Sequence, residues 1–352
     1  MTSTLLSLGC ALIAFSPALT LLLLFAYQKA QLIIIVTTSA FCYLLSSLFS
    51  SLLNLPFSFI PNIGKWSAFI FIPISVLCQA FFRCAFVKMY LKVESVIEKS
   101  IQNHEMEENK RNQMGRSRSS DSRSTSHEGK EEEDHDEEEK TNNDTGVSES
   151  SLLRLELNDV SCSIAAGIGF GGMHTILLYG TLLASEGGRK NGTLYQPSCA
   201  VMPSLINSAI MAFWFSILDI VWMMVALYGV RMWENHLQYK VSQKRVSQNY
   251  VQNQNQSVFT AYNTGTAIMN EWSFGIGRVS GKAALSFMVL SHLIASFVTT
   301  LNVIIPANGC IVSLPLLAIV VIGIIATCWV FLKGSFLPES QKQRIRLANH
   351  LD

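Results

Sequence analysis

The side chains in this sequence that could do chemistry inside an apolar environment are few. Five strongly polar residues interrupt long apolar runs: Gln79, Arg83, His174, Asp219 and His292. Such side chains are costly in hydrocarbon, so each is predicted to face the interior of a helix bundle or a wet cavity. Arg83 has a second option. It lies four residues before the end of its run, and its long stem could carry the charge to the interface.

Asp219 and His292 are predicted to meet. Asp219 lies eleven residues from the end of its apolar run, and His292 lies nine residues from the start of the next run. At a rise of about 1.5 Å per residue, the two depths agree to within about 3 Å. Neighbouring antiparallel helices would therefore bring these side chains within hydrogen-bonding distance. His174 is interpreted as a packing histidine.

These residues do not form a recognisable catalytic set. An intramembrane aspartyl protease needs two carboxylates that share a proton, and Asp219 is the only acid deep in an apolar run. A metal site needs three or more converging ligands, which two histidines and one Asp on different runs would supply only by fortunate geometry. A serine mechanism lacks a credible base. The sequence therefore predicts no catalytic residue, no metal and no cofactor, and favours a binding or structural role.

A row of small residues indicates close helix packing. Ser163, Gly167 and Gly171 follow one another at four-residue intervals. Four residues advance a helix by about 400°, so the three positions lie along one nearly straight groove. Such a groove lets a second helix approach closely in a membrane. The sequence leaves open whether that helix belongs to this chain or to a partner.

Seven charge-poor runs supply the elements that must position these residues. Each has about the length needed to cross ~30 Å of hydrocarbon as a helix. The runs are Thr4–Tyr27, Leu32–Leu55, Trp66–Val87, Val160–Ser185, Ser204–Val230, Ala283–Ile304 and Ile311–Leu332. The predicted fold is an all-α polytopic membrane protein with seven transmembrane helices. A compact soluble enzyme is excluded, and so is a nucleic-acid-binding domain, because no basic face remains outside the apolar runs.

The basic residues predict the orientation of the spans. If the N-terminus is lumenal or extracellular, only Lys65, Arg189 and Lys190 fall on the outer side. Most other Lys and Arg residues, many of them beside a span, then fall on the cytoplasmic side, which is where membrane proteins concentrate them. The C-terminus is therefore predicted to be cytoplasmic.

Two polar segments divide the chain. Residues 92–150 hold 17 Asp/Glu and 9 Lys/Arg, and their low apolar content predicts a disordered acidic cytoplasmic insert. Residues 241–281, which are rich in Gln, Asn and Ser, are predicted to form a second polar cytoplasmic insert. The remaining parts are spans one to three in 1–91, spans four and five in 151–240, spans six and seven in 282–333, and a cytoplasmic tail in 334–352.

Two covalent modifications are considered on the predicted outer side. The 8 cysteines show no metal-binding spacing. Cys199 and Cys310 both fall in outer loops, where cysteines can oxidise, so a Cys199–Cys310 disulfide is a hypothesis. Among the N-x-S/T sequons, only Asn191 would face the lumen as a glycosylation site.

Short motifs follow one another along the apolar runs. They are Gly9-Cys10 with Phe15-Ser16-Pro17-Ala18, Ile33-Ile34 with Ser39-Ala40-Phe41, Gln79-x-x-x-Arg83 with Lys88, the Ser163/Gly167/Gly171 row, Ser291-His292-Leu293 with Leu301-Asn302, and Gly334-Ser335. In order and spacing this set resembles the anterior-pharynx-defective (Aph-1-like) family of gamma-secretase subunits. The resemblance covers all seven runs and neither insert. Two positions depart from the family pattern: Ser163 replaces a usual glycine, and Asp219 stands where the family has a histidine.

The resemblance implies a non-catalytic scaffold subunit of gamma-secretase, an intramembrane aspartyl protease complex. Such a subunit would bind nicastrin first, and then presenilin, which supplies the catalytic aspartates, and the presenilin enhancer subunit. By analogy, the small-residue row and the intramembrane polar positions would support assembly and the cavity that receives the C-terminal end of presenilin. The complex would cleave Notch-like and amyloid-precursor-like type I membrane proteins in the endoplasmic reticulum, Golgi and plasma membrane.

Two other classes of protein remain as alternatives. A seven-span receptor fits the number of spans and their orientation, but no acidic-Arg-aromatic triplet closes the third span and no Asn-Pro-x-x-Tyr motif occurs in the seventh. A small transporter is also compatible with the span count, although the sequence has no visible internal repeat.

Overall fold

The computed structural model describes residues 2–27, 29–59, 67–121, 159–187, 195–196, 199–252, 280–305 and 309–332. It contains seven helices that are long and apolar enough to cross a membrane, which confirms the predicted fold class. The spans are Leu5–Ala26, Ala30–Phe57, Phe69–Ile97, Asp159–Ala184, Ser204–Glu234, Gly281–Asn302 and Gly309–Leu332. The orientation of the termini stays a prediction.

Two of the spans contain a π-helical turn. The first consists of α1 (Thr2–Leu21) and η1 (Leu22–Ala26), and the fourth consists of α5 (Asp159–Thr175), η3 (Ile176–Gly180) and α6 (Thr181–Gly187). The others are α2 (Ala30–Ser58), α3 (Ser67–Asp121), α7 (Ser204–Gln252), α8 (Gly281–Ile304) and α9 (Gly309–Leu332). These apolar runs are helical because, in lipid, a helix satisfies its own backbone hydrogen bonds.

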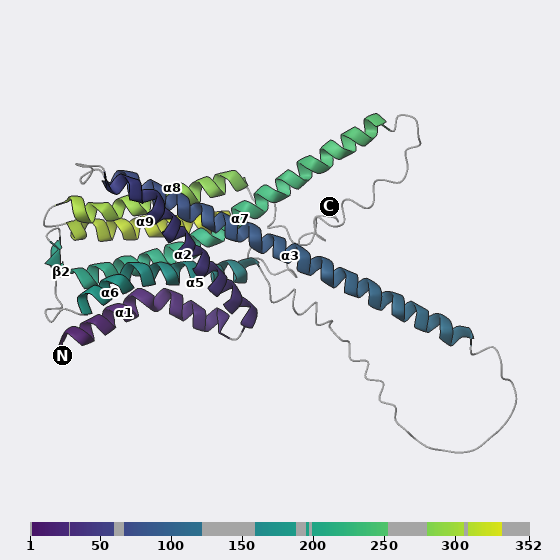
Figure 1. Cartoon of the computed structure of the whole chain (residues 1–352), viewed down its shortest axis with the longest axis horizontal. Helices are drawn as coiled ribbons and strands as arrows, with labels where there is room; N and C mark the ends of the chain where they lie inside the picture. The colour runs from purple at the N-terminus through teal and green to yellow at the C-terminus, as the bar shows by residue number, and fades with distance from the viewer. Residues whose placement is uncertain are drawn as a thin grey trace, which may run out of the picture. The chain divides into compact units, whose positions relative to one another are not determined.

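The core of the bundle is formed around two helices. α7 is the most buried span and the fourth span the second, whereas only 17–33% of the residues in the other five are buried. The closest packing joins α5 with α7 and α2, α1 with α7, and α8 with α7 and α9. In Figure 1, α8 and α9 lie on one side of the bundle and α1 on the other, with α5 between them. Exposed apolar residues such as Leu5, Ile34 and Trp329 are suited to contact with lipid chains.

Two helices continue past their spans into the predicted polar inserts. α3 runs on to Asp121, so residues 92–121 are helical rather than disordered, and α7 runs on to Gln252. Each continuation extends a helix that its span has already nucleated, and 92–121 is rich in Glu, Lys, Arg and Gln, which favour helices. The chain forms two compact units, Met89–Asn158 and the remainder. The rest of the inserts, 122–150 and 253–279, lies outside the described residues.

A short hairpin and a disulfide close one end of the bundle. β1 (Tyr195–Gln196) pairs with the antiparallel β2 (Cys199–Pro203), which leads directly into α7. Cys199 in β2 is disulfide-bonded to Cys310 at the start of α9, with the two Cα atoms 5.5 Å apart. Both residues are buried, so the bond ties the entry of α7 to the entry of α9. The sequon residue Asn191 lies outside the described residues.

Candidate functional site

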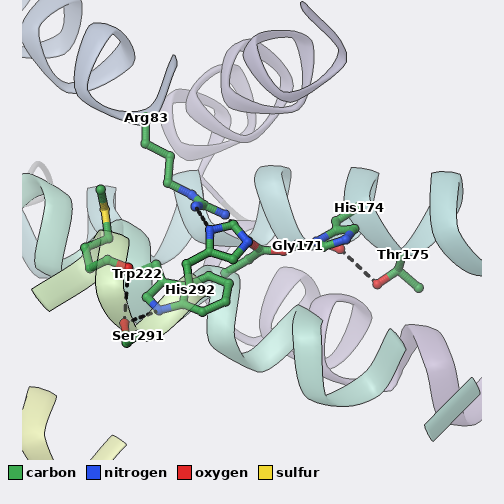
Figure 2. Close-up of polar contacts among 9 residues, drawn as sticks. Arg83, Gly171, His174, Thr175, Trp222, Ser291 and His292 are labelled. Atoms are coloured by element: carbon green, nitrogen blue, oxygen red, sulfur yellow. Dashed lines mark hydrogen bonds and ion pairs between the residues drawn. The ribbon is translucent and has the colours of Figure 1, made fainter. Parts of the chain in front are cut away.

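Four of the polar residues singled out in the sequence meet inside the bundle, each on a different helix. Nη2 of Arg83 on α3 pairs with Oδ1 of Asp219 on α7, and both side chains are completely buried. Nη1 of Arg83 lies 3.2 Å from Nδ1 of His292 on α8. Nδ1 of His174 on α5 lies 2.7 Å from Oδ2, the other carboxylate oxygen of Asp219. This polar cluster therefore links α3, α5, α7 and α8 (Figure 2).

Aromatic rings surround the guanidinium group of Arg83. Its carbon Cζ lies 5.3 Å from the ring centroid of Phe170 and 5.2 Å from that of Trp222, and cations are attracted to the faces of such rings. The ring of His292 stacks on Trp222 with the centroids 4.0 Å apart. The indole N–H of Trp222 donates to Oγ of Ser291 at 3.0 Å, as the dashed line in Figure 2 shows. The rings and the ion pair together fix the position of the charges.

The structure differs from the sequence predictions at these residues. Arg83 does not reach the interface, because Asp219 offers it a buried counter-charge. Within the described residues, Asp219 and His292 share no direct hydrogen bond; Arg83 lies between them, since its planar fork of N–H groups can serve both. His174 does stack on Tyr43, but it also bonds to Asp219. The sequence did contain an indication of that contact, because His174 and Asp219 lie at depths in their spans that differ by only about one helical turn.

A cavity of about 700 Å³ lies beside the cluster, between α3, the fourth span, α7 and α8. His174 and His292 line it, together with the side-chain amides of Gln79, Asn207 and Asn302. The side-chain oxygen of each amide is buried without a hydrogen-bond partner among the described residues. An unsatisfied buried acceptor is unfavourable, but these oxygens are shielded in this arrangement, so a donor from another molecule would reach them only after the amide side chains turn toward the cavity.

The cavity extends toward the end of the bundle that carries the disulfide. Asn207 lies in the first turn of α7, soon after β2, and Asn302 lies in the last turn of α8. A Cβ added to Gly309, at the start of α9, would lie 2.7 Å from the backbone oxygen of Asn302, so α8 and α9 approach closely there. The sequence did not single out either asparagine as a site residue. The feature of the sequence that could have indicated them is an amide side chain near the end of an apolar run.

The small residues of α5 pack against another helix of this chain. A Cβ added to Gly167 would lie 2.6 Å from Cα of Ile220, and one added to Gly171 would lie 2.8 Å from the backbone oxygen of Ser216, both on α7. Ser163 is buried as well, and its hydroxyl donates to the backbone oxygen of Val160 at 2.8 Å. At the two glycines, the groove is therefore filled by α7.

A further glycine makes a close contact that the sequence did not single out. Gly169 faces α2, where an added Cβ would collide with Oγ of Ser39 and the backbone oxygen of Val36. Residues two positions apart point to nearly opposite sides of a helix. Gly169 and its neighbours Gly167 and Gly171 therefore hold α5 between α2 and α7.

The comparison with known families identifies the family of the chain. The family model described as Aph-1 protein matches residues 5–335. The chain belongs to the Aph-1 family. It is thereby a gamma-secretase subunit and a multi-pass membrane protein, and the alternatives of receptor and transporter have no support in the match. No curated protein matches the chain.

In this Aph-1 family chain the polar cluster is arranged to hold charges in place. Both oxygens of Asp219 are engaged, one by Arg83 and the other by His174. Among the described residues, no group of three or more His, Cys, Asp or Glu side chains is placed to hold a metal ion. The cavity, rather than the buried ion pair, is the part of the site that another molecule can reach.

Proposed function

We propose that this gamma-secretase subunit is a non-catalytic scaffold that holds presenilin, nicastrin and the presenilin enhancer subunit together. The observation that carries the proposal is the cavity of about 700 Å³ between four spans, which is lined by Gln79, Asn207 and Asn302 and is large enough to receive a segment of another chain. The buried ion pair and the glycine contacts of α5 give that cavity rigid walls. Presenilin would supply the catalytic aspartates of the complex.

The occupant that we propose for the cavity is the C-terminal end of presenilin. Backbone N–H groups at an extended chain end have no internal partner, and the side-chain amides of Gln79, Asn207 and Asn302, which line the cavity, would accept from them once these side chains turn toward the occupant. A volume of about 700 Å³ falls in the range of about 300–1,000 Å³ that is typical of small-ligand sites. The cavity is therefore suited to a few residues rather than to a whole helix.

We place the N-terminus and the cavity mouth on the lumenal side and the C-terminus in the cytoplasm. The distribution of Lys and Arg supports this orientation. The Cys199–Cys310 disulfide, at the same end as the cavity, also supports it, because disulfides form in the lumen of the endoplasmic reticulum. The complex would act in the endoplasmic reticulum, Golgi and plasma membrane on Notch-like and amyloid-precursor-like type I membrane proteins.

Co-purification tests the scaffold function. The full-length chain, solubilised in mild detergent from cells that make all the subunits, is expected to carry presenilin and nicastrin with it. A chain that is monodisperse and disulfide-bonded, but that recovers neither protein, would contradict the proposal.

His292→Ala sharpens this test. The change removes a ring that bonds to Arg83 and lines the cavity. Presenilin recovery is expected to fall about tenfold, the effect of losing ~1.4 kcal/mol of binding free energy, while nicastrin recovery is retained. The matched control is His236→Ala, at an exposed histidine of α7. Equal presenilin recovery from the two variants would restrict His292 to a packing role.

A further inference from the structure

We propose that the surface where α7 meets the start of α8 binds the headgroup of an anionic phospholipid of the cytoplasmic leaflet. The site consists of one exposed side of α7 together with Lys282, which lies in the first turn of α8. This surface is separate from the polar cavity, so the proposal goes beyond the proposed function. Only the choice of leaflet rests on the orientation proposed above.

Close packing brings the start of α8 against α7. A Cβ added to Gly281 would lie 2.7 Å from the backbone nitrogen of Trp233, so the two backbones touch at this turn of α7. Lys282 follows directly, and its Nζ lies 5.8 Å from the ring centroid of Trp233. The side chain of Trp233 is 40% exposed, and Lys282 is exposed as well. A cation and an indole ring are therefore held together at the surface of the bundle.

This turn of α7 lies at the boundary of the membrane. α8 begins there with Gly281, and α5 begins nearby with Asp159, whose Oδ1 accepts from Nη2 of Arg231 at 2.5 Å. Charged residues are unfavourable in hydrocarbon, so these helix starts mark its edge. Trp residues are enriched at the level of the lipid headgroups. Trp233 and Lys282 are therefore positioned where headgroups begin.

α7 carries a basic stripe beyond this boundary. The helix continues to Gln252, and residues 231–252 hold four Lys/Arg but only one acid, Glu234. Four positions at intervals of four, three and four residues fall within about 60° on one side of the helix. Glu234 falls about 100° from Trp233, and Arg231, which is paired with Asp159, falls about 160° from it. The basic stripe consists of Trp233, Leu237, Lys240 and Lys244.

The order of side chains along the basic stripe matches a phospholipid. Its first two members are exposed apolar residues, Trp233 and Leu237 at 49%, which suit the glycerol and the upper part of the acyl chains. Lysines follow, and an ammonium group donates to phosphate oxygens. Among the described residues, Lys282 contacts the ring of Trp233 and pairs with no carboxylate. The apolar half of the stripe favours a lipid over a soluble anion.

The charge of the site favours anionic over zwitterionic lipid. The cytoplasmic leaflet carries anionic lipids, and each Lys or Arg close to it strengthens the attraction about fivefold. Two lysines on the basic stripe and Lys282 beside it therefore predict a clear preference. We expect this preference to depend on salt, because mobile ions screen charges at an exposed surface.

Binding of short-chain fluorescent lipids to the detergent-solubilised full-length chain tests the proposal. Phosphatidylserine and phosphatidylcholine with identical acyl chains are compared by fluorescence anisotropy. Phosphatidylserine is expected to bind about tenfold more tightly, and the preference should shrink when salt rises from about 0.05 M to about 0.5 M. Equal binding of the two lipids, or no binding of either, would overturn the proposal. Displacement by free phosphoserine as effective as by unlabelled phosphatidylserine would overturn the choice of a lipid.

A pair of double variants locates the site on α7. Lys240→Gln/Lys244→Gln removes two charges from the basic stripe and should reduce phosphatidylserine binding about tenfold, with phosphatidylcholine binding unchanged. The matched control is Lys92→Gln/Lys99→Gln, at two exposed lysines of α3. Glu94 and Glu98 lie between them in the sequence, so this segment has no net positive charge and the control should keep the preference. Equal losses in the two variants would show that the site is not on α7.

Substitutions of Lys282 test the contribution of α8. Lys282→Gln is expected to weaken phosphatidylserine binding about fivefold. Lys282→Arg should bind as the parent chain does, because arginine keeps the charge and can also stack on the ring of Trp233. If Lys282→Gln binds as tightly as the parent chain, α8 is not part of the site and the proposal fails in this form.

These outcomes can be separated from those of the proposed function. All of the lysine variants should still recover presenilin and nicastrin, since none of them changes the cavity. Each is used when the Cys199–Cys310 disulfide is intact on a non-reducing gel, and if none passes, the two lipids compared on the parent chain still decide the preference for anionic lipid. A C-terminal epitope tag in sealed microsomes should be open to protease. A protected tag would overturn the choice of leaflet without affecting co-purification.

Discussion

α3 and α5 line the same cavity but are held in the bundle in opposite ways. α5 is fixed by close backbone approach, because three of its glycines leave no room for a Cβ against α7 or α2. α3 is not among the most closely packed pairs of described helices. It is held by side chains: Arg83 reaches Asp219 and His292, and aromatic rings of α3 meet rings of α2, α5 and α8.

The difference shows how a membrane bundle can be rigid and still enclose space. In lipid the hydrophobic effect does not drive helices to associate, so they are held together by close packing or by polar contacts. Close packing fills the volume between two helices, as it does between α5 and α7. A long charged side chain can bridge a gap, so α3 stands away from α7 far enough to leave the cavity. The pair of Arg83 and Asp219 spans this gap.

The largest effect is expected where the ion pair of α3 is broken. Asp219→Asn keeps the shape of the side chain but leaves the buried cation of Arg83 without a counter-charge, which costs about 3–5 kcal/mol. The detergent-solubilised variant should unfold at a much lower temperature in an intrinsic-fluorescence scan.

A double variant serves as the control for this prediction. Arg83→Met/Asp219→Leu removes both charges and should recover most of the loss in stability, because no unpaired charge remains buried. It should still lower presenilin recovery, since the contact of Arg83 with His292 is lost. If Asp219→Asn is as stable as the parent chain, the ion pair does not hold α3.

A smaller effect is expected at the backbone contact of α5. Gly167→Ala places a methyl group 2.6 Å from Cα of Ile220, where no side-chain rotation can relieve the overlap, and overpacking costs about 1–3 kcal/mol. The matched control is Gly172→Ala, whose added Cβ would meet only Cβ of Ala18, at 3.7 Å. Alanine is favoured over glycine within a helix by about 0.5–1 kcal/mol, so the control should gain stability. Shifts of the unfolding temperature in the same direction would contradict the close packing of α5 on α7.

The smallest effect is expected at a hydrogen bond between α2 and α3. The hydroxyl oxygens of Ser50 and Ser75 lie 2.6 Å apart, and such bonds between membrane helices contribute about 0.6 kcal/mol on average. Ser50→Ala should lower the unfolding temperature slightly and leave presenilin recovery unchanged. A marked loss of presenilin would show that this contact, rather than Arg83, sets the distance of α3 from the bundle.

The spans were predictable because lipid constrains them so strongly. The predicted run Ser204–Val230 and the observed span Ser204–Glu234 begin at the same residue, since an exposed backbone is excluded from hydrocarbon wherever the chain crosses it. The continuation of α3 to Asp121 was not predictable from its polar composition. A segment of helix-forming residues with little apolar surface is marginal alone, but it can be helical when it extends an existing helix.

Composition and position along each run dictate which residues lie inside the membrane, because the cost of burying Arg83, Asp219 or His292 in lipid depends only on their chemistry and depth. They do not dictate which of these side chains meet. Pairing depends on how each helix is rotated about its own axis and which helix lies beside it, and one residue changes that rotation by about 100°. For this reason the three-dimensional arrangement alone places Arg83 between its two partners, brings His174 to Asp219 and fills the glycine groove with α7.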